Sequence, residues 1–171
     1  QQCPKRQFAI LEARESIGGT WDLFRYPGIR SDSDMTTFGY RFKPWRKASV
    51  LADAASIRGY LSEVVDEQHL REKIYFGQRV IAANYDSVTK QWCVDIINAQ
   101  QEKQTWIANF IFSCTGYYDY AQGFLPHYPN QTAFQGQLIY PQHWPESLDY
   151  QGKKIVVIGS GATAITLLPA L

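Results

Sequence analysis

KKIVVIGSGATA, residues 153–164, is the stretch that decides the fold class. It contains a short run of β-branched residues typical of a buried strand, and the glycine-bearing segment GSGATA follows before a helical pattern begins. In that setting a GxGxxA spacing lets the backbone approach the pyrophosphate of a dinucleotide at the start of the helix. The stretch therefore predicts an α/β fold with a dinucleotide site, and an ordinary tight turn is the alternative.

All six residues of this segment are predicted contacts to a nicotinamide cofactor. They are Gly159, Ser160, Gly161, Ala162, Thr163 and Ala164. The residue that distinguishes NAD from NADP stands about 20 positions further along such a motif, which is past Leu171. The spacing by itself therefore leaves open which of the two cofactors the motif would bind.

Two segments earlier in the chain carry clear strand and helix signals. Residues 7–11 form an apolar run long enough for a short buried strand, which ends at Glu12. From Asp53, a candidate N-cap, apolar residues recur every three or four positions as far as about Gln68. We therefore expect a buried strand and an amphipathic helix ahead of the dinucleotide motif.

Three runs rich in β-branched and aromatic residues follow the predicted helix, and polar turns join them. They cover residues 74–85, 91–97 and 105–112. Runs of this kind, separated by short polar turns, predict a small antiparallel meander. Glycines and prolines between residues 116 and 129 then predict a linker.

Charge and cysteine content exclude several classes of function. The 171 residues carry 17 basic and 16 acidic side chains, so no field of one sign would attract nucleic acid or an anionic membrane. Cys3, Cys93 and Cys114 form no CxxC pair, and His69 and His127 lack metal-ligand spacing. We therefore predict no metal site, no nucleic-acid partner and a cytoplasmic setting, with peripheral membrane association left open.

The ends of the chain and its apolar runs give two further expectations. The sequence begins without methionine, enters a strand pattern almost at once, and stops two residues after Pro169. Because a strand needs neighbours in a sheet, we expect a fragment of a larger protein. No apolar run approaches the roughly 18 residues that would span a bilayer, so no transmembrane segment is predicted.

Glu12 is a candidate ribose ligand. An acidic side chain at the end of a parallel strand can accept hydrogen bonds from both hydroxyls of a ribose. A glutamate in such a place is more often a solvated charge. The ribose role therefore depends on the residues that follow.

The segment from Glu12 to Asp32 resembles the FAD-binding stretch of the flavin-dependent class B monooxygenases. GGTWDLFRYPGIRSD, residues 18–32, fits the Baeyer–Villiger fingerprint, in which GxW is followed at fixed spacing by an aromatic-Pro-Gly turn and an aspartate. RYPGIRSDSD, FGYRFKPW, PQHWPESLDY and GSGATA are together similar to the ethionamide-activating and long-chain alkane monooxygenases of that class. The chain is thus expected to be part of a flavoprotein.

A second fingerprint of the same family, FxGxxxHxxxW followed by Pro or Asp, matches residues 134–145 at its phenylalanine, glycine, tryptophan and proline. Tyr140 stands where the family has histidine. That histidine is thought to couple cofactor movement to catalysis, and tyrosine cannot carry a positive charge near neutral pH. We therefore expect weaker coupling of NADPH use to oxygenation, with His143 as the alternative to the missing histidine.

The resemblance implies an α/β flavoprotein with two Rossmann-like dinucleotide-binding domains, incomplete in this chain, and the small antiparallel meander. It implies three parts along the sequence. They are an FAD-binding domain at 1–122 without its first βα unit, an interdomain linker at 123–151, and the start of an NADPH-binding domain at 152–171.

The resemblance also implies the site residues. For FAD they are Glu12, Gly18, Gly19, Thr20, Trp21, Asp22, Leu23 and Val80. For the nicotinamide cofactor they are Arg30, Ser31 and Asp32, together with GSGATA. Asp32 is also the catalytic candidate, because the family's aspartate pairs with a mobile arginine from much later in the chain. A buried carboxylate without a cation is costly, so Asp32 is expected to depend on that arginine.

The implied activity is oxidation by O2 with FAD and NADPH. NADPH reduces the flavin, the reduced flavin and O2 give a C4a-peroxide, and one oxygen atom passes to a small apolar ketone or to sulfide or thioamide sulfur. Three alternatives remain: alkane hydroxylation, oxidation of heteroatoms only, and a non-catalytic flavin- or nucleotide-binding remnant. A disulfide reductase is disfavoured because the redox-active cysteine pair is absent.

Overall fold

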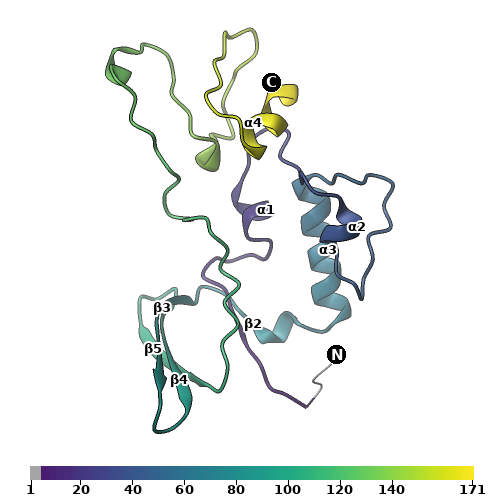
Figure 1. Cartoon of the computed structure of the whole chain (residues 1–171), viewed down its shortest axis with the longest axis vertical. Helices are drawn as coiled ribbons and strands as arrows, with labels where there is room; N and C mark the ends of the chain where they lie inside the picture. Colours follow the sequence, from purple (N-terminus) through teal and green to yellow (C-terminus); the bar gives the residue numbers. More distant parts are fainter. Residues whose placement is uncertain (1–4) are drawn as a thin grey trace. The chain divides into compact units, whose positions relative to one another are not determined.

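The computed structural model describes residues 5–171, so Cys3 lies outside the described residues (Figure 1). The longer elements in chain order are β1 (Ile10–Leu11), α1 (Thr20–Leu23), α2 (Met35–Phe38), α3 (Ala54–Glu67), β2 (Ile74–Tyr75), β3 (Arg79–Asp86), β4 (Gln91–Ile97), β5 (Lys103–Ala108) and α4 (Ala162–Leu167). Single 3₁₀ turns lie at Arg71–Lys73, Gln131–Ala133, Pro141–His143 and Leu168–Ala170.

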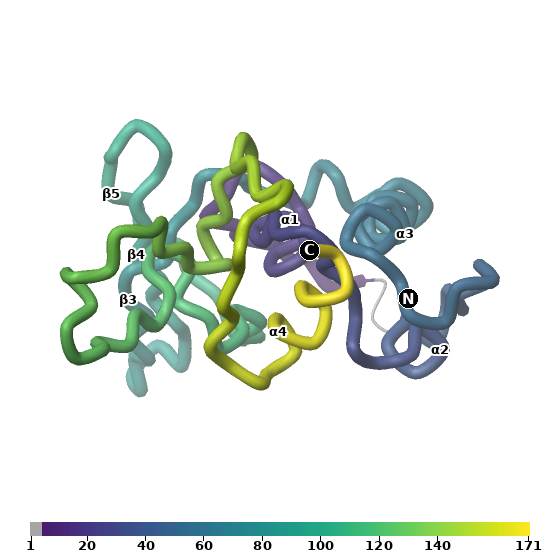
Figure 2. Tube along the Cα trace, turned by 90° about the horizontal axis from the view of Figure 1, so that it is seen from above, coloured from purple at the N-terminus to yellow at the C-terminus, as the bar shows by residue number. Residues whose placement is uncertain are grey.

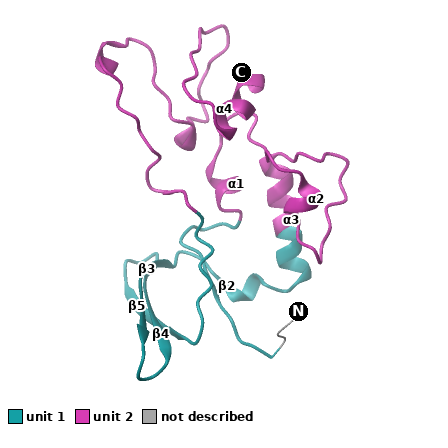
Figure 3. Ribbon diagram, in the orientation of Figure 1, with its two compact units in different colours: residues 1–17, 62–116 teal, residues 18–61, 117–171 magenta. Residues whose placement is uncertain are grey.

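The chain divides into two compact units (Figure 3). The first combines the part up to Ile17 with Ser62–Gly116, and the second combines Gly18–Leu61 with Tyr117–Leu171. The predicted domain limits at residues 122 and 151 stay a prediction.

The first unit contains a parallel pair of short strands. Ile10 of β1 is in register with Ile74 of β2, and Leu11 with Tyr75. The ladder continues one step, because the Glu12 amide donates to the Tyr75 carbonyl over 2.9 Å. Glu12 therefore stands directly after a parallel strand, as predicted, although the strand is shorter than residues 7–11.

The predicted meander forms in the first unit, with strand order β3-β4-β5 and both pairs antiparallel. Two of its predicted limits are wrong. The run 74–85 is divided at Gly77, whose φ of +65° turns the chain between β2 and β3. The run 105–112 gives a strand at 103–108, because Ala108 pairs with Trp92 near the start of β4 and the residues after it have no partner in that strand.

The turn between β3 and β4 is held by Asp86. Its carboxylate accepts hydrogen bonds from the amides of Val88, over 2.8 Å, and Thr89, and from the Thr89 hydroxyl. These bonds, the Thr89 hydroxyl foremost, keep the pKa of Asp86 below its usual value. The last turn residue, Lys90, has a φ of +57°.

Helix α3 follows the predicted pattern closely. The Asp53 carboxylate caps it by accepting the Ser56 amide over 2.6 Å, and the helix ends at Glu67, one residue before the predicted Gln68. Most apolar positions of the predicted pattern are buried, with Ile57 only 1% exposed, and Leu61 is partly buried. The 3.6-residue period therefore predicted both the type and the buried face of this helix.

In the second unit, α2 lies close to α3 (Figure 2). Tyr60 of α3 fixes the loop that carries α2. The Tyr40 amide donates to the Tyr60 hydroxyl over 2.7 Å, and that hydroxyl donates to the Lys43 carbonyl over 2.6 Å. Met35 of α2 is fully buried, and Trp45 packs edge-on against the Tyr60 ring. The N-terminal half of α3 is thereby built into the core of this unit.

The strand predicted at 153–158 is not formed within residues 5–171. Strand geometry is maintained by hydrogen bonds to a neighbouring strand, and no described strand pairs with this segment. Val156 and Ile158 are accordingly 84% and 67% exposed. The helix predicted after it does form, as α4.

The described residues contain no helix with both the length and the apolarity needed to cross a bilayer. They also contain no cluster of three or more His, Cys, Asp and Glu side chains suited to a metal ion.

Candidate functional site

Residues 18–32, here called the flavin loop, begin with a tight glycine turn in the second unit. Gly18 has a φ of +115° and Gly19 a φ of +51°, values that side-chain-bearing residues rarely adopt. The turn starts the single helical turn α1, with the Trp21 amide donating to the Gly18 carbonyl over 3.0 Å. The two predicted glycines are therefore required by the backbone itself.

Space around the turn is also limited. A Cβ on Gly19 would lie 3.0 Å from the Tyr120 hydroxyl, which is also 3.4 Å from the Thr20 hydroxyl. Trp21 packs edge-on against Phe38, with ring centroids 6.0 Å apart. The backbone of α1 is thus held between α2 and the segment after residue 116.

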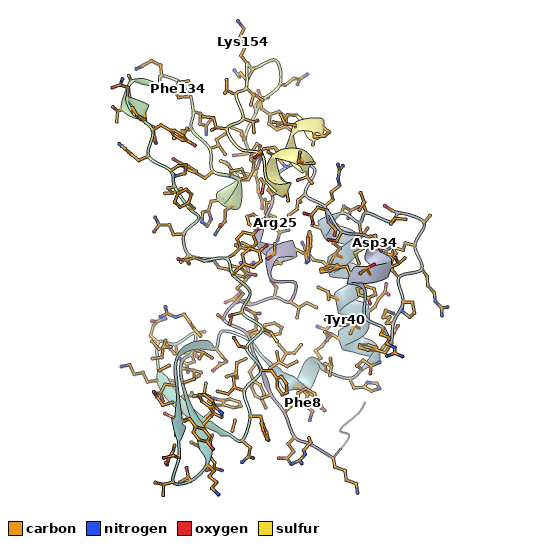
Figure 4. All side chains as sticks on the ribbon, viewed as in Figure 1. Phe8, Arg25, Asp34, Tyr40, Phe134 and Lys154 are labelled. Atoms are coloured by element: carbon orange, nitrogen blue, oxygen red, sulfur yellow. The ribbon has the colours of Figure 1, made fainter. Side chains whose placement is uncertain are left out.

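Asp22 is a buried carboxylate within α1, and its residue is 7% exposed. Its Oδ1 accepts from Arg25 Nη2 over 3.1 Å and lies 3.5 Å from Arg58 Nε. Figure 4 shows Arg25 in the segment that follows α1. Neither arginine was predicted as a site residue. For Arg58 the reason is that the sequence contains no signal that α3 meets this loop.

The second half of the flavin loop packs on α4, the helix that follows GSGATA. Phe24, Tyr26 and Leu167 form a buried cluster, against which Trp144 packs. The Tyr26 and Thr166 hydroxyls are 3.2 Å apart and hydrogen-bonded, and Thr166 is 2% exposed. The structure therefore brings the RYPG turn and the helix of the dinucleotide motif together, a contact that sequence reasoning missed.

Gly28 lies at the tightest point of this contact. Its φ is +76°, and a Cβ there would lie 2.7 Å from Ala170 Cβ and closer still to the Thr166 carbonyl oxygen. The glycine of the fingerprint therefore has a packing role in addition to its conformational one.

Residues 30–32 run alongside the residues that precede α3. Arg30 bridges Asp53 in antiparallel fashion, and the Ser31 amide donates to the Ala52 carbonyl over 2.8 Å. Ser31 is 2% exposed, and its hydroxyl donates to the Ser33 carbonyl over 2.7 Å. The contact of Ser31 with the nicotinamide cofactor stays a prediction.

Asp32 is exposed in this structure, whereas the sequence led us to expect a buried carboxylate that needs a cation beside it. The physical reason is alternation: in an extended segment, neighbouring side chains point to opposite sides, and Ser31 takes the buried side. Arg30 is likewise exposed. The two charged residues therefore lie on the solvent side of the flavin loop, where their charges are accessible.

Tyr118 stands near this end of the loop, and its ring packs edge-on against Phe24 with centroids 5.2 Å apart. Partial burial is the largest cause of a raised pKa of Tyr118, followed by its hydrogen bond to Tyr117. The charge of Asp32 adds a smaller increase. This phenol therefore stays protonated as a hydrogen-bond donor.

Glu12 and Val80, the two other predicted FAD residues, lie in the first unit. Glu12 is half-buried and its Oε1 accepts the Arg14 amide over 2.9 Å. Val80 pairs with Ile96 in the meander and is 46% exposed. Both positions suit contacts that use one carboxylate oxygen or the backbone.

GSGATA forms a turn that leads into α4. Gly159 has a φ of +144°, whereas Gly161, the N-cap of α4, has an ordinary φ of −78°. A Cβ at either position would meet no described atom within 4 Å. The described chain thus gives no packing reason for glycine at 161, whereas a dinucleotide lying against the backbone would give one.

The second fingerprint is explained in part by local packing. A Cβ on Gly136 would lie within 2.8 Å of Phe134 Cε1, so the ring of the fingerprint phenylalanine rests on the glycine. Phe134 itself is 61% exposed. Tyr140 is half-buried, and its hydroxyl accepts from Gln131 Nε2 over 3.4 Å, so the residue that replaces histidine is tied within the linker.

Two shallow hollows of about 530 Å³ each occur among the described residues of the second unit. One is lined by residues 148–153 with Ile155 and Leu171, and the other by residues 117–119 and 122–125 with Gln142. The first lies beside the segment that leads into GSGATA. Neither includes a residue of the flavin loop.

The flavin-binding monooxygenase-like family model matches residues 47–169. The chain belongs to this family. Among curated proteins, the flavin-binding monooxygenase-like chain is 68% identical over 171 residues to the probable FAD-binding monooxygenase AlmA of Acinetobacter baylyi. It is 54% identical over 169 residues to the putative FAD-containing monooxygenase MymA of Mycobacterium tuberculosis, and 51% identical over 170 residues to the FAD-containing monooxygenase EthA of Mycolicibacterium smegmatis.

These alignments cover 98–100% of the chain but 34% of each relative, so the chain spans about a third of the length of the curated relatives it matches. Solved structures agree. Oxidised steroid monooxygenase bound to NADP matches with a TM-score of 0.79 and 28% identity, covering 98% of this chain and 32% of that one. OTEMO in complex with FAD and NADP matches with a TM-score of 0.78 and 26% identity, covering 99% and 33%.

The comparisons confirm the resemblance to flavin monooxygenases of Baeyer–Villiger type and the two-dinucleotide-domain flavoprotein class. The cofactors expected from the sequence, FAD and NADP, are those of the solved structures. The residues assigned to them in this chain stay predictions.

Proposed function

We propose that the whole protein is an FAD- and NADPH-dependent monooxygenase that transfers one oxygen atom of O2 to small apolar ketones and to sulfide or thioamide sulfur. The observation that carries the proposal is the packing of the RYPG turn on α4, through Phe24, Tyr26 and Leu167. This contact joins residues 18–32 and α4, the two segments predicted to meet the cofactors, within one compact unit. A monooxygenase of this kind needs both nucleotides held in one frame.

The residues present fit both cofactors. The positive φ values at Gly18 and Gly19 turn the backbone into α1, and the open space at Gly159 and Gly161 admits a pyrophosphate. Glu12 keeps one carboxylate oxygen for a ribose hydroxyl while the other accepts the Arg14 amide. When bound, NADPH supplies the hydride and FAD supplies the activation of O2.

The exposed charges of the flavin loop give the remaining roles. The Arg30 guanidinium, on the solvent side, can pair with a phosphate of NADPH. The Asp32 carboxylate is equally accessible and can hold a cationic side chain from another part of the whole protein. The cytoplasm is the proposed location, because Cys93 and Cys114 are both free thiols.

The test uses the purified whole protein. It is expected to carry bound FAD, to oxidise NADPH in air, and to convert a long-chain ketone to an ester and a sulfide to a sulfoxide, with products identified by mass. Sulfoxide without ester would indicate heteroatom oxidation only, and an alcohol from an alkane would indicate hydroxylation. Bound FAD without NADPH oxidation would favour a non-catalytic remnant and overturn the proposal.

Changing Tyr140 to histidine is expected to improve coupling. Tyr140 is tied to Gln131 through a 3.4 Å hydrogen bond, and histidine would restore a group that can carry a proton near neutral pH. We expect hydrogen peroxide released per NADPH to fall roughly two- to threefold, the effect of one hydrogen bond of ~0.5 kcal/mol. The measurement is peroxide and product yield per NADPH, and unchanged peroxide release with unchanged turnover would contradict the prediction. Replacing the neighbouring His143 by glutamine tests whether that side chain already fills the role.

A further inference from the structure

We propose that Asp22 and Arg58 are a positioning pair that ties the flavin loop to helix α3 and thereby sets where the backbone of α1 meets FAD. The inference rests on the proposed function, because it assumes that this loop contacts the flavin. It deepens that proposal by giving Asp22 a role other than direct contact and by adding Arg58, which the sequence did not single out.

The two arginines that pair with Asp22 belong to different elements and therefore have different effects on the loop. The Asp22 side chain is 8% exposed, and its Oδ1 lies 3.1 Å from Arg25 Nη2 and 3.5 Å from Arg58 Nε. Arg25 belongs to the flavin loop, so its ion pair closes the loop on itself. Arg58 belongs to α3, so its ion pair is the one that joins the loop to another element.

Helix α1 needs such an anchor. It has four residues, and its N-cap, Gly19, makes no side-chain capping bond. A helix of one turn is not stable by itself, because the entropy of nucleation exceeds what so few hydrogen bonds return. Its position must therefore come from contacts to other elements.

Helix α3 is suited to provide that anchor. It has 14 residues, is capped by Asp53, and buries Ile57 and Tyr60 on either side of Arg58 in the sequence. The Arg58 guanidinium therefore projects from a well-fixed backbone. Its side chain is 40% exposed, and its Nε faces the Asp22 carboxylate.

The glycine turn is fitted to this pair. A Cβ on Gly18 would lie 3.3 Å from Arg58 Cγ and 3.3 Å from Asp22 Cβ. The start of the GGTW segment thus lies directly against the stem of Arg58. A shift of Arg58 would move the turn that the proposed function places beneath the flavin.

The direction of the Asp22 carboxylate explains why the residue is acidic. The carboxylate is buried and faces two partly exposed guanidinium groups, which compensate a charge that would be costly if it were unpaired. The contribution of Asp22 to FAD binding is therefore positional, through the backbone of α1.

The experiment measures FAD affinity of the whole protein by flavin fluorescence for Asp22→Asn, Arg58→Gln and the double variant. Each single variant is expected to weaken FAD binding about tenfold, which corresponds to ~1.4 kcal/mol. The double variant is expected to bind FAD no more weakly than Asp22→Asn alone, because Asp22→Asn already removes the pair that Arg58→Gln breaks. Arg58→Lys, which keeps the charge, is expected to recover part of the affinity.

A matched control lies on the same helix. Asp66 pairs with Arg71 over 2.8 Å, but these side chains are 57% and 65% exposed. Asp66→Asn therefore removes an Asp–Arg ion pair that belongs to the other compact unit and has no part in the flavin loop. FAD affinity of this variant is expected to equal that of the unchanged protein.

A second readout separates positioning from general stability. The thermal midpoint is measured with and without FAD, and a positioning role predicts that the variants lose much of the midpoint gain that FAD provides. Unchanged FAD affinity in both single variants, or equal losses of midpoint with and without FAD, would overturn the proposal. If the unchanged protein binds no FAD, the proposed function fails and the pair loses its stated role with it.

Discussion

Gly28→Ala is expected to destabilise the whole protein by about 3 kcal/mol, the sum of left-handed backbone strain and overpacking. The glycine has a φ of +76°, and a new Cβ would press on the Thr166 carbonyl and on Ala170 Cβ, 2.7 Å away. The carbonyl belongs to the backbone of α4 and cannot turn aside as a flexible side chain would. The measurement is the free energy of unfolding by urea or guanidinium.

Gly59→Ala is the matched control for this prediction. Gly59 lies within α3, and a Cβ there would meet no described atom within 4 Å. Alanine at this place is expected to stabilise the protein by roughly 0.5 to 1 kcal/mol, because it lowers the entropy of the unfolded chain. A Gly28→Ala protein within ~0.5 kcal/mol of the unchanged one would show that the RYPG turn does not rest on α4.

Gly161→Ala is expected to weaken NADPH binding about 10- to 100-fold, the cost of a misplacement near 1 Å. A methyl group here would meet no described atom within 4 Å, and the φ of −78° suits alanine. Stability is therefore expected to change by less than ~1 kcal/mol, since glycine is only a moderately better N-cap. The loss of affinity would come from the methyl group occupying the place of the pyrophosphate.

FAD binding by the Gly161→Ala protein itself is the internal control for this prediction. FAD affinity should remain unchanged, because the prediction assigns GSGATA to the nicotinamide cofactor alone. NADPH affinity is obtained from the rate of flavin reduction at increasing NADPH concentration, and Gly59→Ala serves again as the glycine control. Full NADPH affinity in the variant would show that this turn does not hold the pyrophosphate.

Local patterns predicted those elements whose hydrogen bonds lie within short stretches of chain. Asp53 and the apolar period after it predicted α3 within one residue at its end. Runs rich in β-branched and aromatic residues predicted the meander, and polar residues predicted its turn at Asp86. The division at Gly77 was not predicted, because β2 pairs with a strand far back in the sequence and periodicity carries no information on partners.

In the candidate site, too, local motifs identified some residues, and others became evident only from tertiary contacts. The fingerprints identified the glycines whose backbone conformations are visible in the structure, Gly18 and Gly19 among them. Arg58 and Thr166 were missed, because they join the loop only through the tertiary fold. The exposure of Asp32 follows from its neighbour Ser31 being buried, which no motif records.

The hydrophobic cluster of Phe24, Tyr26 and Leu167 has a consequence for local opening of the protein. Two of its residues belong to the flavin loop and one to α4, and Trp144 of the linker packs against the cluster. Elements that share their buried contacts unfold locally as one cooperative unit. A fluctuation that frees the flavin fingerprint from its packing therefore also releases the helix of the dinucleotide motif, so the two motifs share a single free energy of opening.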